Sequence, residues 1–349
     1  MKIYEERRLK LTENLSGDIA VIIPGSVLAN RSNDTAYPFR QDSNFYYLSG
    51  FNEPDSTLMI INKSGKTNSI GFVPKKDKLK EIWDGFRHGP EGMKSDFGFN
   101  DAFNNDEIDE LLPDLLDGVS CVYYPFGKVE GFDQKVIKWT KKANSKDRHS
   151  KKMEIADISK IIGNKRLIKD SSEINIIEKA CKISANAHLE AMKFVKPGMN
   201  EAEVEAFYLY EFAKNGGRFP AYNPIVASGE NACVLHYVEN NQVINDGDLL
   251  LVDAGCEYEM YASDITRTFP ANGKFSDEQL QIYNIVLEAQ KASVDAVSKG
   301  NGVMDPQTIS EKVITEGLID LGIIKGNLEE EHEKGSFKDF YMHKIGHWM

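Results

Sequence analysis

The sequence predicts an α/β (α+β) protein built from two domains. The chain has 349 residues, which is about twice the length of a typical domain. Short apolar runs alternate with polar breaks through residues 1–165, whereas residues 166–349 combine long helical patterns with a strand-rich stretch at 222–269. We therefore expect the first domain to end near residue 165, with the basic, polar stretch at 141–152 as a linker or surface loop near the boundary.

The composition narrows the classes of function. Lys and Arg total 42 against 54 Asp and Glu, which gives a formal net charge of −12. A general binder of nucleic acid or of anionic membranes needs a basic surface, so this balance argues against both classes. The four cysteines lack CxxC spacing, and no apolar run reaches the roughly 20 residues of a membrane span. Because the charged N-terminus also lacks the apolar core of a secretory signal, we expect a cytoplasmic protein with reduced thiols.

Four short apolar runs bounded by turn-forming residues predict β-strands in the first domain. They cover residues 18–25, 45–49, 56–62 and 121–124. Apolar side chains at helical spacing predict a helix at 106–116, between the last two strands. This mixture is typical of an α/β domain of modest size.

Capping signals predict three long helices in the second domain. The helices are expected to begin after Asp170, Asn200 and Ser276, because each of these residues has Glu or Gln three positions later. They are expected to end at Pro197-Gly198, at Gly216-Gly217 and near Gly300. The apolar stripes that predict their buried faces are Ile174, Ile177, Cys181, Ala185 and Met192 on the first helix, and Ile282, Ile285, Val286 and Ala289 on the third.

Two aspartates lie between the second and third of these helices. Asp253 is near the end of the apolar run 249–254, and Asp264 follows in the strand-like run 261–269. The short connection at 255–260 predicts an antiparallel hairpin, in which opposed side chains share a face with their Cβ atoms about 5 Å apart. Two carboxylates at that distance repel each other and lose solvation, which a divalent cation such as Mn²⁺ or Mg²⁺ would offset.

A structural interpretation of the same acids stays open. Asp253 could cap a turn, and Asp264 could pair with the nearby Arg267. A charge that is buried without a partner costs several kcal/mol, so an acid inside the apolar run LLLVDA favours the functional interpretation. The spacing by itself does not decide between the two.

Three histidines are candidates for the same site. His343 and His347 form an HxxxH pattern, and His236 lies in the apolar run 232–237, which we expect to be a strand. His236 could equally be a hydrogen-bonded core residue, and the pair could be two solvated residues of a helix. Imidazole binds Mn, Zn, Co or Fe, so histidine ligands do not identify the metal. The other histidines stand in polar or helical contexts and are expected at the surface: His88, His149, His188 and His332.

Four segments resemble the Xaa-Pro aminopeptidase (aminopeptidase P) family. They are residues 40–54 (RQDSNFYYLSGFNEP), 228–237 (SGENACVLHY), 249–270 (LLLVDAGCEYEMYASDITRTFP) and 342–348 (MHKIGHW). The family consists of dinuclear metallopeptidases of the creatinase/methionine aminopeptidase superfamily. The resemblance implies an N-terminal creatinase-like α/β domain over residues 1–165 and a C-terminal pita-bread catalytic domain over residues 166–349.

The resemblance also implies roles for individual residues. Asp253, Asp264 and His347 match metal ligands, with Asp264 as the ligand that bridges two ions. His236 and His343 match histidines that contact the substrate. These five positions form the candidate active site.

Three further residues match the family less specifically. Tyr222 and Arg166 fall at familiar positions. Trp83 resembles a tryptophan that lines the active site of a neighbouring subunit in bacterial members, although it could simply be a core residue. The family resemblance also implies a homodimer or a homotetramer for the full-length protein.

By resemblance, the chain is a metal-dependent exopeptidase. It would remove the N-terminal residue from peptides with proline in the second position, using a hydroxide that bridges two divalent metal ions. Mn²⁺ is the first expectation for the metal, and Zn, Co and Fe stay open. Two alternatives remain: an Xaa-Pro dipeptidase (prolidase), and a metal-poor, non-catalytic pita-bread paralogue.

The sequence departs from the family pattern at two points. Two glutamates and a further histidine are expected after the HxxxHW segment, but the sequence ends at Met349. We therefore expect a truncated pita-bread domain without its last strands, an incomplete second metal site, weak metal binding and little hydrolysis. Lys344 stands where family members usually carry glycine. The acidic run at 329–333 precedes the histidines and is expected to be a solvated helix end, not a replacement for the glutamates.

Overall fold

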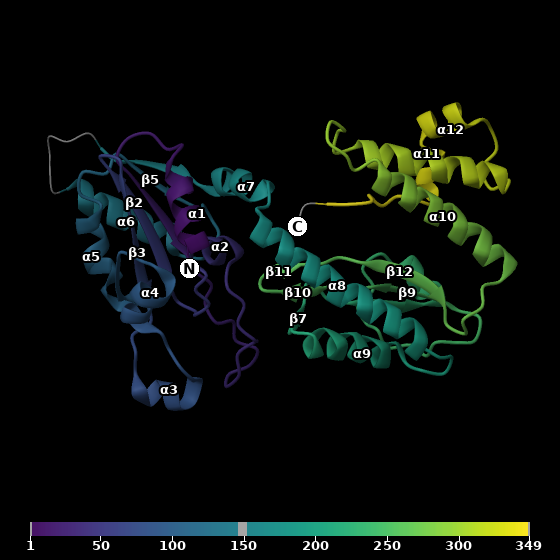
Figure 1. Ribbon diagram of the computed structural model, residues 1–349, viewed down its shortest axis with the longest axis horizontal. Coiled ribbons are helices and arrows are strands. Elements are labelled where there is room, and N and C mark those ends of the chain that lie inside the picture. Colours follow the sequence, from purple (N-terminus) through teal and green to yellow (C-terminus); the bar gives the residue numbers. More distant parts are fainter. Residues whose placement is uncertain (1, 146–151, 348–349) are drawn as a thin grey trace. The chain divides into compact units, whose positions relative to one another are not determined.

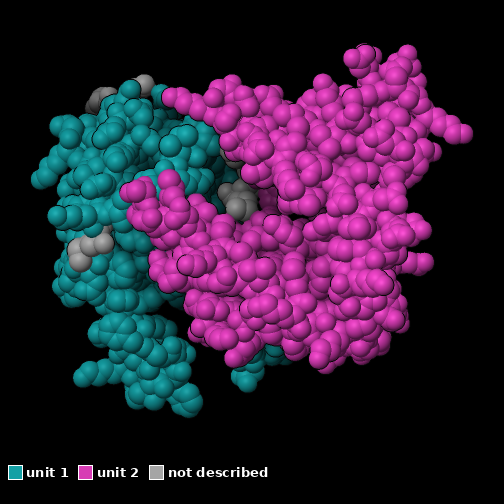
Figure 2. All heavy atoms as spheres, turned by 45° about the vertical axis from the view of Figure 1, so that its right-hand side comes forward, with its two compact units in different colours: residues 1–170 teal, residues 171–349 magenta. Residues whose placement is uncertain are grey.

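The fold is that of a computed structural model, which describes residues 2–145 and 152–347. The chain divides into two compact units, Met1–Asp170 and Ser171–Met349, which are coloured separately in Figure 2. Both units mix helices and strands, which confirms the predicted fold class. Across the described ranges, no helix combines the length and the apolar character needed to span a membrane.

The first unit is built on a six-stranded mixed sheet with the order β4-β3-β2-β1-β5-β6 (Figure 1). Its strands are β1 (Ile19–Pro24), β2 (Thr57–Lys63), β3 (Lys66–Val73), β4 (Asp101–Asn104), β5 (Cys121–Tyr124) and β6 (Glu154–Asp157). The β1–β2 and β2–β3 pairs are antiparallel, whereas β3–β4, β1–β5 and β5–β6 are parallel. The predicted strands at 18–25, 56–62 and 121–124 are thus confirmed as β1, β2 and β5.

Helices cover both faces of this sheet. They are α1 (Lys2–Thr12), α2 (Ser43–Ser49), α4 (Gly89–Phe97), α5 (Ile108–Leu115), α6 (Phe132–Asn144) and α7 (Ser159–Leu167). Helix α3 (Lys78–Asp84) of the same unit has no buried residue and does not cover the sheet. Ile19, Val21 and Ile23 of β1 pack into a core with α1, α2, α4 and α7. Ala20 and Ile22 pack into a second core with α5 and α6. Because β1 is buried on both faces, its sequence is a continuous apolar run and not an alternating one.

The strand predicted at 45–49 is wrong, because these residues belong to helix α2. The Asp42 side chain accepts hydrogen bonds from the backbone N–H groups of Asn44 and Phe45, both at 2.9 Å. Gly50 ends the helix with φ 67°, a left-handed conformation that glycine adopts at low cost. Caps at both ends therefore outweigh the strand preference of the aromatic residues between them.

The linker predicted at 141–152 is wrong in its first part. Residues 141–144 form the last turn of α6, where Lys141 and Lys142 stabilise the negative end of the helix dipole. Residues 146–151, including His149, lie outside the described residues. The predicted boundary at residue 165 lies within α7, shortly before the division between the two units.

The second unit contains two small antiparallel sheets, with the strand orders β11-β10-β7 and β12-β9-β8. Its strands are β7 (Phe219–Pro220), β8 (Ile225–Ser228), β9 (Leu249–Asp253), β10 (Cys256–Tyr258), β11 (Tyr261–Ala262) and β12 (Thr266–Pro270). Its helices are α8 (Ser171–Phe194), α9 (Glu201–Lys214), α10 (Asp277–Asp295), α11 (Asp305–Asp320) and α12 (Leu328–Lys334). Helices α8 and α9 share one core with both sheets, and α10 and α11 enclose a smaller core.

The predicted helix starts in this unit are confirmed. Asn200 with Glu203, and Ser276 with Gln279, form capping boxes at α9 and α10. Helix α8 begins at Ser171, directly after Asp170.

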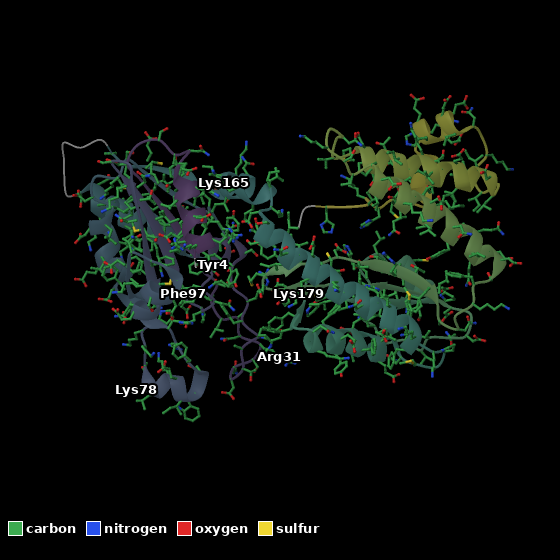
Figure 3. The ribbon with its side chains drawn as sticks, viewed as in Figure 1. Tyr4, Arg31, Lys78, Phe97, Lys165 and Lys179 are labelled. Carbon is green, nitrogen blue, oxygen red and sulfur yellow. The ribbon has the colours of Figure 1, made fainter. Side chains whose placement is uncertain are left out.

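The predicted buried face of α8 is wrong. Ile174 and Met192 are exposed, as is Cys181. The buried side chains of the actual face are Glu173, Ala180, Ile183, Ser184, Ala187, His188 and Ala191. Small side chains on this face let α8 approach β10 closely. Lys179 of α8, labelled in Figure 3, donates a hydrogen bond to the hydroxyl oxygen of Tyr258 in β10 at 2.8 Å. On α10, likewise, Ile282 and Val286 are exposed, whereas Ile285 and Ala289 pack against the core.

Candidate active site

Asp253 and Asp264 come together at one end of the β12-β9-β8 sheet. Asp253 is the last residue of β9 and pairs with Thr266, the first residue of β12. The Tyr222 hydroxyl oxygen links the two acids, at 2.5 Å from Asp253 Oδ1 and 3.2 Å from Asp264 Oδ1. The predicted proximity is therefore confirmed, but the predicted direct opposition is wrong, because Asp264 precedes β12. The connection after Asp253 forms β10 and β11 in the other sheet.

Burial is the largest influence on the pKa of Asp253. Burial raises the pKa of Asp253, and the nearby charge of Asp264 raises it further, against hydrogen bonds from Tyr222 and Thr266 that lower it. Burial, followed by the contacts with both carboxylates, raises the pKa of Tyr222 far above its ordinary value of 10.0. The phenol therefore keeps its proton and acts as a donor. Two acids joined by a neutral phenol form a place where a cation would lower the electrostatic energy.

The alternative pairing of Asp264 with Arg267 is not found among the described residues. Arg267 Nη1 donates to the Thr266 carbonyl oxygen at 2.7 Å. Asp264 instead faces His347, whose Nε2 lies 3.2 Å from Asp264 Oδ2. His347 is thus brought to the acid pair, as the resemblance implies.

An electrostatic interaction with His343 also lowers the pKa of Asp253. Both candidate histidines stand in an irregular segment after the short 3₁₀ helix η3 (Ser336–Asp339), so the alternative of two helical residues is wrong. The backbone N–H of Ile345 donates to Gln307 Oε1 at 2.8 Å and ties this segment to α11. Trp348, the last residue of the HxxxHW pattern, lies outside the described residues.

His236 does not lie in a strand. The prediction at 232–237 is wrong, since the 3₁₀ helix η2 (Gly229–Cys233) is followed by a turn that carries His236. The apolar run was misleading because Val234 and Leu235 are about half exposed, at 55% and 53%. His236 is itself exposed, with no hydrogen bond or ion pair within the described ranges, so the core alternative is wrong too.

Glu201, at the start of α9, organises the loop that carries His236. Its side chain is fully buried. Oε1 accepts hydrogen bonds from Ser228 N, Ser228 Oγ and Asn231 Nδ2, and Oε2 accepts from Tyr237 Oη and Gln242 N, all between 2.7 and 3.2 Å. Burial raises the pKa of Glu201, but these hydrogen bonds outweigh burial and bring the pKa below its ordinary value of 4.5. One charged carboxylate therefore serves as the common acceptor for residues 228–242.

The donor groups suit a divalent metal ion. Asp253 and Asp264 supply carboxylate oxygens and His347 supplies an imidazole nitrogen, which are ligand types that Mn²⁺ and Zn²⁺ bind. Tyr222 links Asp253 to Asp264, and His347 contacts Asp264 directly. Within residues 2–145 and 152–347, however, no group of three or more His, Cys, Asp and Glu side chains has the arrangement of a metal site. The three candidates thus fit in chemistry and in pairwise placement, without forming a complete ligand cluster.

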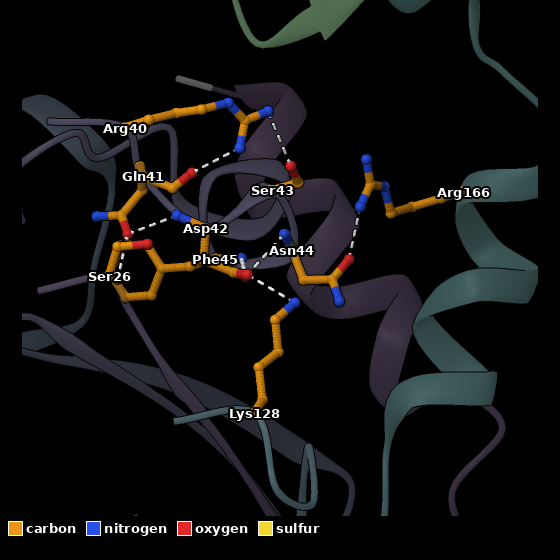
Figure 4. A network of polar contacts seen from close by, with 9 residues as sticks. All are labelled: Ser26, Arg40, Gln41, Asp42, Ser43, Asn44, Phe45, Lys128 and Arg166. Carbon is orange, nitrogen blue, oxygen red and sulfur yellow. Dashed lines mark hydrogen bonds and ion pairs between the residues drawn. The ribbon is translucent and has the colours of Figure 1, made fainter. Parts of the chain in front are cut away.

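The first of the family-like segments forms a polar network inside the N-terminal unit (Figure 4). Gln41 is fully buried, and its Oε1 accepts from two backbone N–H groups at 2.7 and 2.9 Å. Asp42 pairs with Lys128 at 2.6 Å, and Asn44 Oδ1 accepts from Arg166 Nη1 at 2.6 Å. Arg166 of α7 is therefore engaged in joining α7 to α2.

Trp83 lies on α3 and is 85% exposed, so the core alternative is wrong. Three neighbouring apolar side chains, Leu79, Ile82 and Phe86, are exposed as well. We call these three residues together with Trp83 the α3 patch. In Figure 3, Lys78 marks the start of this helix.

The sequence did not single out some of the residues that support the site. Tyr222 had only a weak family signal, although it links both acids. His188 was expected at the surface, which is wrong, because it is 3% exposed. The acidic run at 329–333 lies in α12, but Glu331 is buried and accepts from Lys334 and Ser336.

Two family models match the chain: metallopeptidase family M24 over residues 175–349, and the aminopeptidase P N-terminal domain over residues 4–123. The chain is 39% identical to the Xaa-Pro aminopeptidase of Haemophilus influenzae over 346 residues, which cover 99% of this chain and 78% of the relative. Among solved structures it resembles Pseudomonas aeruginosa aminopeptidase PepP, with a TM-score of 0.96 and 39% identity over 99% of this chain and 79% of that one. It also resembles zinc-substituted Escherichia coli aminopeptidase P in complex with product, with a TM-score of 0.96 and 37% identity over 99% of this chain and 80% of that one.

Proposed function

This chain belongs to metallopeptidase family M24 and is a hydrolase of the Xaa-Pro aminopeptidase type, and from this premise we propose that it releases the N-terminal residue from peptides with proline in the second position. It carries an aminopeptidase P N-terminal domain and, after it, the pita-bread fold of the family. Membership of family M24 implies divalent metal ions.

The observation that carries the proposal is the meeting of two acids and a histidine. Tyr222 links Asp253 to Asp264, and His347 contacts Asp264. We assign these two aspartates and His347 as metal ligands, with Asp264 as the ligand shared between two ions. Mn²⁺ is the first choice, and Zn²⁺ is supported by the zinc-substituted E. coli relative. When bound, such ions lower the pKa of water and polarise the scissile carbonyl group.

The roles of Tyr222 and of the three histidines follow from the hydrogen bonds that each side chain can donate. Tyr222 keeps its proton at Oη and holds the two carboxylates together without adding charge. Nε2 of His347 lies 3.2 Å from Asp264 Oδ2, which brings the imidazole beside the shared acid. His236, on its exposed turn, is free to donate to the carbonyl oxygen or to the groups beyond the cleaved bond. His343 donates through Nδ1 to the Lys344 carbonyl oxygen at 2.5 Å, which leaves its Nε2 for the substrate.

The acids also explain why an exopeptidase is the expected class. The free α-amine of a peptide has a pKa of about 7.7–8.0, so part of it is uncharged near neutral pH and could bind a divalent ion held by these acids. An Xaa-Pro bond lacks the N–H group that most peptidases bind. Selection of proline therefore depends on the shape of the site around the second residue.

Peptide cleavage by the Mn²⁺-loaded chain tests the proposal. We expect release of alanine from Ala-Pro-Ala, with Ala-Ala-Ala as the matched control that lacks proline. Faster cleavage of Ala-Pro than of Ala-Pro-Ala would identify a prolidase instead. Elemental analysis that finds no metal, together with no cleavage, would support the non-catalytic paralogue.

We also propose that the chain forms a homodimer or homotetramer through the α3 patch. The support is the exposure of Trp83, at 85%, next to three more exposed apolar side chains of the same patch. Sedimentation velocity of Trp83→Ala against wild type measures the effect, and Lys78→Ala on the same helix serves as the control. An unchanged oligomer in Trp83→Ala, or a monomeric wild type, would contradict this assignment.

A further inference from the structure

Buried hydrogen bonds connect helix α8 to the backbone of the residue that follows Asp253. His188 is 3% exposed, with Nε2 at 3.1 Å from the Ala254 carbonyl oxygen and Nδ1 at 2.9 Å from the Tyr208 hydroxyl oxygen. A carbonyl oxygen can only accept, so Nε2 carries the proton and Nδ1 accepts from Tyr208. Burial lowers the pKa of His188, which keeps the ring neutral and gives both hydrogen bonds a defined direction. Ala254 is the residue directly after Asp253.

Ser184 lies one helical turn before His188, on the same buried face. Its Oγ accepts from the backbone N–H of Cys256 at 2.9 Å and lies 2.8 Å from Ser263 Oγ. Ser263 Oγ donates its own proton to the Cys256 carbonyl oxygen at 2.9 Å, so Ser184 is the donor between the two hydroxyls. Ser263 is the residue directly before Asp264.

Gly255 brings these two backbone segments into direct contact. A Cβ atom at this position would lie 1.8 Å from the Ser263 carbonyl oxygen and 3.1 Å from Asp264 N, so no other residue fits without a backbone shift. On the other side of Asp264, the carbonyl oxygen of Ile265 accepts from Ala254 N at 3.1 Å. Residues 254–255, which follow Asp253, are therefore in direct backbone contact with residues 263–265, which flank Asp264.

We propose that Ser184 and His188 are positioning residues that set the separation of the Asp253 and Asp264 carboxylates. They act through the backbone of residues 254–256 and 263, because neither side chain hydrogen-bonds to an acid in the part of the chain that the structure describes. This inference rests on the proposed function, which takes both acids as metal ligands.

The polar character of these two side chains favours positioning over simple packing. Apolar side chains of similar size would cover the same face of α8 without the cost of desolvating a histidine and a serine. Directional hydrogen bonds, unlike apolar contacts, hold the two segments in one geometry. Groups that hydrogen-bond directly to metal ligands typically change metal affinity or activity by about 10- to 100-fold when they are mutated, and an effect passed through the backbone is expected at the lower end of this range.

Calorimetric titration with Mn²⁺ measures the effect on the site. His188→Leu and Ser184→Ala are expected to weaken Mn²⁺ binding by about tenfold. His188→Gln, whose amide N–H can replace the Nε2 donor, is expected to recover most of the affinity. Leu189→Ala is the matched control, because Leu189 is the next residue of α8 and is 56% exposed. Unchanged affinity in both loss variants, with the wild type binding, would overturn the inference.

Hydrogen exchange of the metal-free chain separates positioning from a general loss of stability. In His188→Leu and Ser184→Ala we expect faster exchange at residues 253–264, with little change in α11. A purely structural role would accelerate both regions equally, and that result, or unchanged exchange at 253–264, would overturn the inference. If His188→Leu does not fold, the same comparison in Ser184→Ala decides.

The two measurements also separate this inference from the proposed function. A wild-type chain that binds no Mn²⁺ contradicts the assignment of Asp253 and Asp264 as metal ligands. The exchange experiment does not need metal, so it still supports or overturns the positioning role of Ser184 and His188 in that case.

Discussion

The hydroxyl oxygen of Tyr222 lies 2.5 Å from Asp253 Oδ1. Because its pKa is raised, the phenol is a neutral donor that satisfies the half-buried Asp253 carboxylate without supplying a compensating charge. The Tyr222 hydroxyl contacts both carboxylates, so the properties of the acid pair should depend on this donor.

Tyr222→Phe removes this donor and leaves the Asp253 carboxylate without its shortest contact. We expect the free energy of unfolding, measured with urea in the presence of a chelator, to fall by about 1–3 kcal/mol, the cost of an unsatisfied buried polar group. Tyr210→Phe is the control, because Tyr210 is 60% exposed. Equal stability of the two variants would show that the Tyr222 hydroxyl contributes nothing to holding the acids.

Gly255→Ala tests the close approach between the backbone segments that flank the acids. The added Cβ would lie 1.8 Å from the Ser263 carbonyl oxygen, so we expect a loss of at least about 3 kcal/mol in the free energy of unfolding. Gly163→Ala is the control, since Gly163 lies in α7 with no atom within 4 Å of the new Cβ. That change is expected to stabilise the first unit by about 0.5–1 kcal/mol. Normal stability of Gly255→Ala would contradict the tight contact.

Glu201→Gln replaces an acceptor of five hydrogen bonds by an amide that turns an NH₂ group toward some of the same donors. Each donor left unsatisfied should cost about 1–3 kcal/mol, and unfolding by urea measures the loss. Glu288→Gln, an exposed change on α10, is the control. A loss no larger than that of Glu288→Gln would contradict the role of Glu201 in the loop.

The same carboxylate predicts a pH dependence of stability. The pKa of Glu201 is lower in the folded chain than its ordinary value of 4.5, so the folded state binds fewer protons there than the unfolded state. Its contribution is therefore fully present above pH 4.5 and is lost as the pH falls through the folded pKa. Urea unfolding above and below pH 4.5 should show a steeper loss for wild type than for Glu201→Gln. Parallel pH profiles would rule out this contribution.

His236→Ala should separate substrate contact from metal binding. His236 is exposed and makes no hydrogen bond or ion pair with the acids in the described ranges. We therefore expect unchanged Mn²⁺ affinity and a loss of about 100-fold in kcat/KM for Ala-Pro-Ala, typical of a lost donor to the reacting group. Weaker Mn²⁺ binding in this variant would instead place His236 among the ligands.

Much of the fold was predictable from local signals. The strands β1, β2 and β5 and the starts of α8, α9 and α10 follow from apolar runs and capping residues that act within a few positions of each other. The residues 45–49 were mistaken for a strand because the helix there depends on caps at Asp42 and Gly50, outside the aromatic run. The buried face of α8 was mistaken because close packing on β10 selects small side chains, which hydrophobicity alone does not reveal.

The site was predictable where single residues carry the chemistry. Asp253, Asp264 and His347 were singled out from the sequence, and the structure brings them together in pairs. The residues around them could not be found in this way. Tyr222 and Glu201 act across long stretches of chain, so only the folded arrangement reveals their partners.

Titration of Mn²⁺ into wild type and Asp264→Asn tests the central claim most directly. Asp264 is the acid that both Tyr222 and His347 contact, whereas Asp295→Asn, at the exposed end of α10, changes charge equally and serves as the control. The proposed site predicts Mn²⁺ binding by wild type and Asp295→Asn, and a loss of affinity of about tenfold or more in Asp264→Asn. Equal binding by all three chains, or no binding by wild type, would contradict the assignment of these residues as the metal centre.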